Sequence, residues 1–170
     1  MRISVLLLLA FGLGAAALAQ TPAKARTAAG PHFCDDLKIV TADTARKFET
    51  IKGAKISESP RDSGGYATVK YRALRKLDGA SVCTVQDYLR PEGNPLRSYA
   101  CEWTPVGSKT ATVLALAQTS ETCVGSNDPL DSMTAAQGRD EATAYVYGED
   151  FGITIGAGTA PQVLFWVRPE

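Results

Sequence analysis

Residues 83–101, CTVQDYLRPEGNPLRSYAC, begin and end with cysteine and carry proline and glycine near their middle. Turn residues between two short runs rich in apolar side chains are typical of a β-hairpin. If Cys83 lies opposite Cys101, then Val85 lies opposite Tyr99, because antiparallel partners keep a constant sum of residue numbers. The stretch therefore predicts a hairpin whose two strands a disulfide can join.

This register sorts the hairpin side chains into two faces, because successive residues of a strand point to opposite sides of the sheet. Asp87 is the exception on the apolar face, and we attribute it to a position near the open loop end. A slip of one residue would mix the two sets, so the register that joins the cysteines also builds a core. The apolar face holds Cys83, Val85, Leu89, Tyr99, Cys101 and Trp103, and the polar face holds Thr84, Gln86, Tyr88, Ala100, Glu102 and Thr104.

The first nineteen residues, MRISVLLLLAFGLGAAALA, have the three parts of a secretory signal peptide. Arg2 supplies the basic start, an apolar run follows, and Ala17-Leu18-Ala19 predicts cleavage before Gln20. The apolar run is shorter than the roughly 20 residues of a membrane-spanning helix. We therefore expect a soluble mature protein in the periplasm or outside the cell, with no membrane span after cleavage.

The mature chain is expected to form one domain. Residues 20–31, QTPAKARTAAGP, lack periodicity and predict a flexible lead-in, and residues 32–170 have the length of a single domain. The 18 basic and 18 acidic residues of the chain give a formal net charge of 0. This balance offers no electrostatic reason to expect nucleic acid as a partner.

Two helices are predicted from apolar residues that recur every three or four positions. The first spans 35–52, with Leu37, Val40 and Phe48 on one face and Gly53 as its stop. The second spans 108–124, with Ser108 as N-cap and Gly125 after its last residue. Between them, 58–65 predicts a loop and the alternating residues 66–73 predict a strand.

The rest of the chain predicts strands after one long loop. Residues 125–141 have turn composition, with a short helix near 132–137, and strands follow at 142–147, 151–155 and 162–168. The predicted fold is α+β, a single domain with two helices packed on one face of a mostly antiparallel five- or six-stranded sheet. The predicted order, α-β-β-β-α-β-β-(β), resembles the small α+β fold of bacterial secretion chaperones, but no motif carries a function across.

The four cysteines are interpreted as two structural disulfides. A zinc site needs about four cysteine or histidine ligands, but the chain has one histidine, His32, and no C-x-x-C pair for a metal or a redox dithiol. An even cysteine count in an exported chain favours disulfides. Cys34 precedes the first helix and Cys123 ends the second, so antiparallel helices predict a Cys34–Cys123 bridge beside Cys83–Cys101.

Catalytic motifs are missing from the sequence. Residues 107–110, GSKT, lack the spacing of a P-loop, and neither G-x-S-x-G nor S-x-x-K occurs. We expect no catalytic residue, no metal site and no cofactor. The favoured function is a non-catalytic binding or accessory role in the cell envelope, toward an unknown protein or small ligand and in an unspecified oligomeric state. The alternative is a carboxylate-dependent hydrolase that uses loop Asp or Glu residues.

One surface is predicted to bind. In 162–168, Trp166 and Arg168 share a face, and in 142–147, Tyr145 and Tyr147 share a face. If helices cover one side of the sheet, large side chains point outward on the other, and exposed aromatics beside an arginine are typical of binding patches. We therefore predict a patch of these four residues. The alternative is that a second layer, such as 125–141, buries them.

Overall fold

The computed structural model describes residues 28–125, 134–135, 142–157 and 163–169. The predicted signal peptide and most of the predicted lead-in and of the loop 125–141 lie outside these residues. Within these residues there are two helices, α1 (Phe33–Ala42) and α2 (Lys109–Val124), and two short 3₁₀ turns, Thr44–Arg46 and Glu49–Ile51, follow α1. The strands are β1 (Lys52–Glu58), β2 (Ala67–Ala73), β3 (Val82–Leu89), β4 (Leu96–Trp103), β5 (Thr134–Ala135), β6 (Ala142–Tyr147), β7 (Phe151–Ala157) and β8 (Val163–Pro169).

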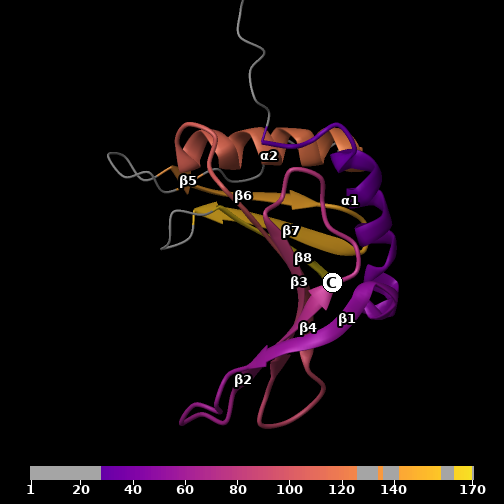
Figure 1. Ribbon diagram of the computed structural model, residues 1–170, viewed down its shortest axis with the longest axis vertical. Coiled ribbons are helices and arrows are strands. Elements are labelled where there is room, and N and C mark those ends of the chain that lie inside the picture. Colours follow the sequence, from indigo (N-terminus) through magenta and orange to yellow (C-terminus); the bar gives the residue numbers. More distant parts are fainter. Residues whose placement is uncertain (1–27, 126–133, 136–141, 158–162, 170) are drawn as a thin grey trace, which may run out of the picture.

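The described strands form one antiparallel sheet in the order β1-β2-β3-β4-β8-β7-β6-β5. The α+β class with two helices on a single antiparallel sheet is confirmed, but the sheet has more strands than the five or six expected. Figure 1 shows α2 lying along β6 and β7 with α1 beside it, while β1 and β2 extend away at the other end of a strongly bent sheet.

The predicted hairpin register is confirmed. Cys83 pairs with Cys101 and Val85 with Tyr99, and a disulfide joins the cysteines across a Cα–Cα distance of 4.1 Å. The second strand of the hairpin, β4, then pairs with β8 from the far end of the chain, where Tyr99 lies opposite Val167. The hairpin therefore lies at the centre of the sheet, where β3 pairs with β2 on one side and β4 pairs with β8 on the other.

The ends of the two helices are joined as the sequence predicts. A disulfide links Cys34 to Cys123 with a Cα–Cα distance of 5.0 Å. The Oγ of Ser108 accepts a hydrogen bond from the backbone N–H of Ala111 at 3.0 Å, which caps the start of α2. Gly125 ends the helix in the left-handed conformation, at φ 70°, which glycine adopts without steric cost.

The first predicted helix is wrong beyond Ala42. After Ala42, hydrogen bonds to Asp43 take the place of the helical ones. The Asp43 carbonyl accepts a hydrogen bond from the N–H of Phe48 at 3.0 Å. Its carboxylate accepts one from the hydroxyl of Thr50 at 2.7 Å and one from the N–H of Thr50 at 3.2 Å. An aspartate side chain that bonds to nearby backbone competes with helix formation. The chain then turns through two left-handed residues, Lys47 and Phe48, at φ 52° and 59°.

Two further predictions need correction. The chain from Lys52 to Glu58 is strand β1, so Gly53 lies inside a strand and does not end a helix. Thr134 and Ala135 pair with β6 as β5, where the sequence predicts a short helix. Phe48 and Ile51 repeat at helical intervals but do not lie on one face of an α-helix. Both are buried, Phe48 just before the second 3₁₀ turn and Ile51 at its end.

The last residues of the predicted lead-in pack onto the fold. Ala28 and Ala29 are buried, and the indole N–H of Trp103 donates to the Ala28 carbonyl at 3.0 Å. The N–H of Gly30 donates to the carbonyl of Asp78 at 3.1 Å. The packed domain therefore begins before residue 31, by Ala28 at the latest.

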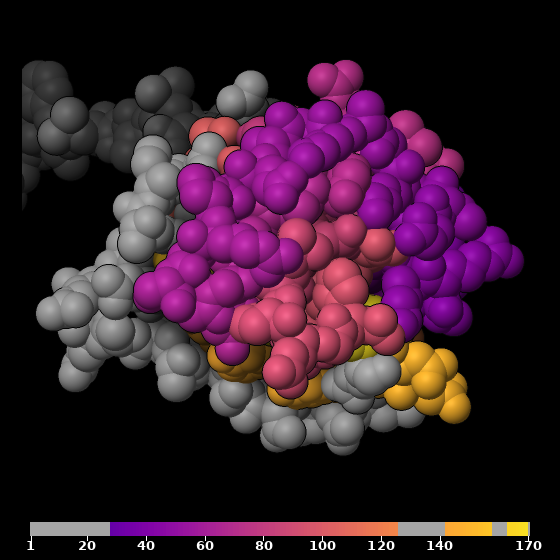
Figure 2. Space-filling model, turned by 90° about the horizontal axis from the view of Figure 1, so that it is seen from below, coloured from indigo at the N-terminus to yellow at the C-terminus, as the bar shows by residue number. Residues whose placement is uncertain are grey.

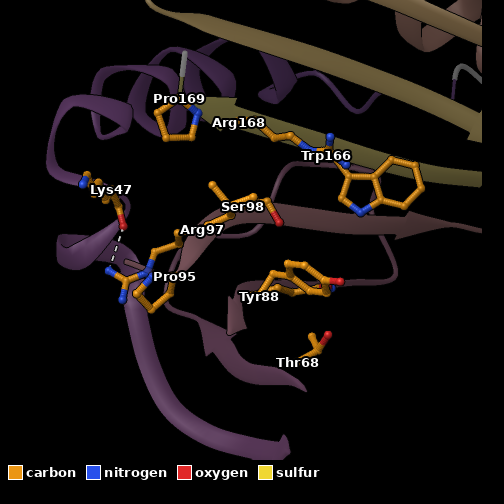
Figure 3. Close-up of a pocket in the computed structure, with 11 residues that line it drawn as sticks. Lys47, Thr68, Tyr88, Pro95, Arg97, Ser98, Trp166, Arg168 and Pro169 are labelled. Carbon is orange, nitrogen blue, oxygen red and sulfur yellow. Dashed lines mark hydrogen bonds between the residues drawn. The ribbon is translucent and has the colours of Figure 1, made fainter. Parts of the chain in front are cut away.

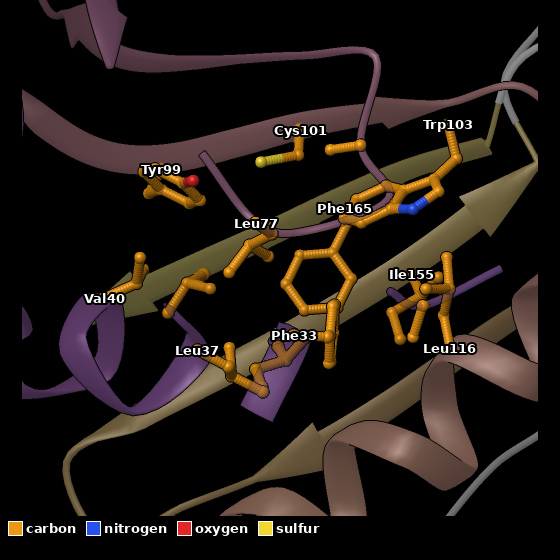
Figure 4. Close-up of a cluster of buried hydrophobic side chains, with 14 of the residues drawn as sticks. Phe33, Leu37, Val40, Leu77, Tyr99, Cys101, Trp103, Leu116, Ile155 and Phe165 are labelled. Atoms are coloured by element: carbon orange, nitrogen blue, oxygen red, sulfur yellow. The ribbon is translucent and has the colours of Figure 1, made fainter. Parts of the chain in front are cut away.

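The core lies between the helices and the inner face of the sheet. Phe33 of α1, Trp103 of β4 and Phe165 of β8 meet at its centre, with ring centroids 5.4 to 6.2 Å apart (Figure 4). Leu77, from the segment between β2 and β3, is fully buried. The hydroxyl of Tyr99 donates to the Arg75 carbonyl in that segment at 2.9 Å. Leu116 of α2 is buried in the same cluster, so both helices, the sheet and the segment before β3 contribute to one core.

Asp87 is on the inner face because it is paired, and not because it lies near an open end. It is 5% exposed, and Arg97 binds its carboxylate through two nitrogens, one of them at 3.0 Å. The Lys52 ammonium lies 3.1 Å from the same carboxylate. Arg97 also binds Glu49 and donates to the Lys47 carbonyl at 3.0 Å. The cluster thus ties β1, β3 and β4 to the left-handed turn.

We predict that the Cys34–Cys123 disulfide stabilises the fold more than the Cys83–Cys101 disulfide. The two bridges span 89 and 18 residues of sequence, and a longer closed loop removes more entropy from the unfolded chain. Replacing each pair by alanine should cost about 1 kcal/mol more for the longer loop. Denaturant unfolding of the two double variants checks this, and equal losses or the reverse order would contradict it.

We predict that Asp87→Asn lowers the free energy of unfolding by about 3 kcal/mol, because Arg97 and Lys52 lose a buried partner. Burial raises the pKa of Asp87, but the hydrogen bonds from Arg97 and Lys52 outweigh it, so the pKa lies below its ordinary value. The stabilisation is complete above the unfolded pKa of about 3.9 and is lost as the pH falls through the lower folded pKa.

Urea unfolding between neutral pH and about pH 2 tests this assignment. The wild-type protein should lose more stability on acidification than Asp87→Asn, and Glu92→Gln, at an exposed position, should follow the wild type. Parallel pH curves for the wild type and Asp87→Asn would show that the carboxylate is not the group concerned.

Candidate binding groove on the outer face

The sheet has a second face, opposite the core, which we call the outer face. Its side chains alternate along the strands with buried Val69, Val85, Tyr99 and Val167. The pairing register aligns them in rows across the sheet. One row runs Thr84, Ala100, Trp166, Thr154, Tyr145, and a neighbouring row runs Lys70, Gln86, Ser98.

Two adjoining cavities hollow this face, with volumes of about 640 and 270 Å³. Gln86 and Trp166 line both, so together they form one depression, which we call the outer groove. The larger cavity, shown in Figure 3, is lined by Lys47, Thr68, Gln86, Tyr88, Pro95, Leu96, Arg97, Ser98, Trp166, Arg168 and Pro169. The smaller is lined by Lys70, Val82, Thr84, Gln86, Ala100, Cys101, Glu102, Leu164 and Trp166.

Trp166 sits at the junction of the two cavities among small neighbours. It lies opposite Ala100 on β4 and Thr154 on β7, and a Cβ added to Gly156 would lie 3.9 Å from the indole Cζ3. Figure 3 shows its indole ring and the Tyr88 ring on the same side of Ser98, with the indole above and the Tyr88 ring below. Small side chains around a half-buried indole leave this ring as the largest contact surface at the junction.

The end of the outer groove near the hairpin loops is aromatic. Tyr88 stacks on Tyr66 with ring centroids 5.4 Å apart and an interplanar angle of 15°. Tyr88 and Leu96 are 42% and 55% exposed. The loop before β2 and the loop of the β3–β4 hairpin lie close together at this end of the molecule (Figure 2), where Gly65 adjoins Pro91. The exposed rings of this end are therefore held by two loops that support each other.

The charged side chains of the groove are mostly basic. Lys47, Arg97 and Arg168 line the larger cavity, and among the residues that the structure describes no carboxylate lines it. Arg97 is occupied by Asp87 and Glu49, whose hydrogen bonds raise its pKa. Arg168 and Lys70 form no ion pair with the described residues. In the described part of the chain, Glu102 is the acidic residue that lines the smaller cavity.

The structure places the four predicted patch residues on the same face and only two of them in the groove. Trp166 and Arg168 line it, whereas Tyr145 and Tyr147 lie on β6, beyond the intervening strand β7. Tyr147 is 45% exposed. The sequence reasoning missed the β2 and β3 side chains that line the groove, although the polar face predicted for the hairpin already contained Gln86 and Tyr88.

The acidic pair Glu149 and Asp150 borders a third cavity of about 400 Å³, beside Lys38 and Cys123. Both carboxylates come from the turn between β6 and β7, and no other acidic residue of the described segments lines this cavity. In the described ranges, no group of three or more His, Cys, Asp or Glu side chains is arranged to hold a metal ion.

No family model matches the chain, and neither a curated protein nor a solved structure matches it. Across the described part of the chain, none of the helices has the length and apolar character needed to cross a membrane.

We predict that iodide quenches the fluorescence of Trp166 several-fold more efficiently than caesium does. The groove cations concentrate an anion beside the indole and repel a cation. Trp103 is 1% exposed and is shielded from both ions. The difference between wild-type and Trp166→Phe spectra isolates the Trp166 signal. Arg168→Gln should reduce iodide quenching, whereas Lys38→Gln, on α1, should not. Equal quenching by both ions would contradict a basic groove.

Proposed function

We propose that this protein is an exported, non-catalytic binding protein of the cell envelope, and that the outer groove holds its ligand. The observation that carries the proposal is the groove itself, which crosses β2, β3, β4 and β8 and has Trp166 at its centre. Its lining combines aromatic rings with hydroxyl and amide groups. A concave surface with a few convergent polar groups is the usual form of a small-molecule site.

The rigidity of the groove supports a binding role. Its floor consists of side chains on paired strands, and side chains on strands are positioned more accurately than side chains on loops. The Cys83–Cys101 disulfide joins two of these strands directly. A preorganised floor lowers the entropy that is lost when a ligand binds.

Export is supported by the cysteines. All four are paired in two disulfides, which is compatible with an oxidising compartment. The leader at 1–19 remains a prediction from the sequence, and with it the periplasmic or extracellular location. The proposal combines this leader, the disulfides and the groove into an accessory role outside the cytoplasm.

The carboxylate-dependent hydrolase is the weaker candidate. Within residues 28–125, 134–135, 142–157 and 163–169, the larger cavity has no acidic lining residue, and the smaller has one, Glu102. General acid and base catalysis on a glycoside or ester needs two groups on opposite sides of the scissile bond. A binding role requires no such pair, so the lining of the groove favours it.

We predict that ligand binding changes the fluorescence of Trp166. The oxidised mature protein is titrated with a fixed panel: neutral oligosaccharides, acidic oligosaccharides, dipeptides and tripeptides, and short-chain phospholipids. At least one class should shift the emission, and the shift should vanish in Trp166→Phe, which retains the buried Trp103. Gln86→Ala should weaken binding about tenfold, because it removes hydrogen bonds from the floor.

Thr110→Ala, at the start of α2 and outside the groove, is the control and should bind like the wild type. Ligand affinity that is unchanged in both Trp166→Phe and Gln86→Ala would place binding elsewhere. The absence of a response to every class in the panel would also contradict the proposal.

A further inference from the structure

The geometry points to an acidic oligosaccharide, a chain of sugars that carry carboxylates, as the ligand of the outer groove. This inference rests on the proposed function and names the chemical class of its ligand. Three properties of the groove carry it: cations that have no acidic partner among the described residues, a floor of hydroxyl and amide groups, and an indole where the two cavities join.

The cations supply charge complementarity. Arg168 lines one cavity and Lys70 the other, and neither forms an ion pair with any described residue. The whole chain has a formal net charge of 0, so this basic character is local to the groove and its rim. A guanidinium binds a carboxylate through two parallel hydrogen bonds, and an ammonium binds it as a point charge. Two separated cations match carboxylates on different units of one chain.

The floor of the groove fits sugar hydroxyls. Thr68, Thr84, Gln86 and Ser98 come from the neighbouring strands β2, β3 and β4 and line the two cavities. Each hydroxyl both donates and accepts a hydrogen bond, and the amide presents two donors and one acceptor oxygen. A sugar ring carries hydroxyls of the same dual character around its rim, so every floor group finds a partner in either orientation.

Trp166 fits the other surface of a sugar. The faces of a pyranose ring consist of C–H groups, which pack on the electron-rich face of an aromatic ring. The indole is shared by both cavities, so a sugar unit on Trp166 has neighbours on either side in the same depression. Tyr88 offers a second ring toward the hairpin loops. The two rings suit an extended chain rather than a single sugar.

Other ligand classes fit less well. An extended peptide usually binds by pairing with a free strand edge, but the groove lies on the face of strands whose backbones are already paired. A lipid chain would leave the hydroxyl and amide groups of Thr68, Gln86 and Ser98 without hydrogen-bond partners. Single-stranded nucleic acid also stacks on aromatic rings, but structural disulfides are typical of compartments outside the cytoplasm.

The test compares trigalacturonic acid, galactotriose and the oligonucleotide dT6, with Trp166 fluorescence and calorimetry as readouts. We expect trigalacturonic acid to bind at least tenfold more tightly than the neutral trisaccharide. Arg168→Gln and Lys70→Gln should each weaken this binding several-fold, and Lys38→Gln, an equal change of charge on α1, should leave it unchanged. Raising the NaCl concentration from 50 to 200 mM should also weaken the binding of trigalacturonic acid to the wild-type protein. Thermal melts of the variants verify that they fold.

Equal affinity for the two trisaccharides would overturn the acidic ligand and would leave the proposed groove in place. Tighter binding of dT6 than of trigalacturonic acid would overturn the inference in favour of nucleic acid. Failure of all three probes would also overturn it, and the wider panel of peptides and lipids then decides the proposed function separately.

Discussion

The pairing of Cys83 with Cys101 is the constraint on which the rest of the structure depends. It fixes the register of β3 and β4 at the centre of the sheet, and β4 passes that register on to β8. A shift of β3 by one residue against β4 would turn its side chains to the opposite faces, burying Gln86 and exposing Val85. The same register therefore decides both the composition of the core and the composition of the outer groove.

A buried ion cluster supports this sheet at the hairpin end. Asp87 binds Arg97 and Lys52, and Arg97 reaches the carbonyl of Lys47 in a turn where two successive non-glycine residues are left-handed. Residues in this region of φ are held there by their surroundings. Because Lys47 and Arg97 also line the larger cavity, the cluster fixes one end of the groove as well as the strand order.

Local patterns predicted much of this fold, since the hairpin, α2 with its caps, both cysteine pairs and the strands after residue 141 follow from alternation, helical periodicity and spacing. The first helix was predicted too long because Phe48 and Ile51 repeat at helical intervals, and the bonds of Asp43 to Phe48 and Thr50 that form the turn leave no periodic pattern in the sequence. Trp166 and Arg168 were predicted as binding residues, whereas Lys47 and Lys70 reach the groove through long-range pairing that no local pattern contains.

We propose that the inner face of the sheet stabilises the fold and that the outer face binds the ligand. Amide chemical-shift mapping of the ¹⁵N-labelled protein during a titration with trigalacturonic acid tests this division most directly. We expect the shifts to concentrate at Gln86, Ser98, Ala100 and Trp166, on three adjacent strands. Shifts that concentrate instead on α1, α2 or the turn at Glu149 and Asp150 would contradict it.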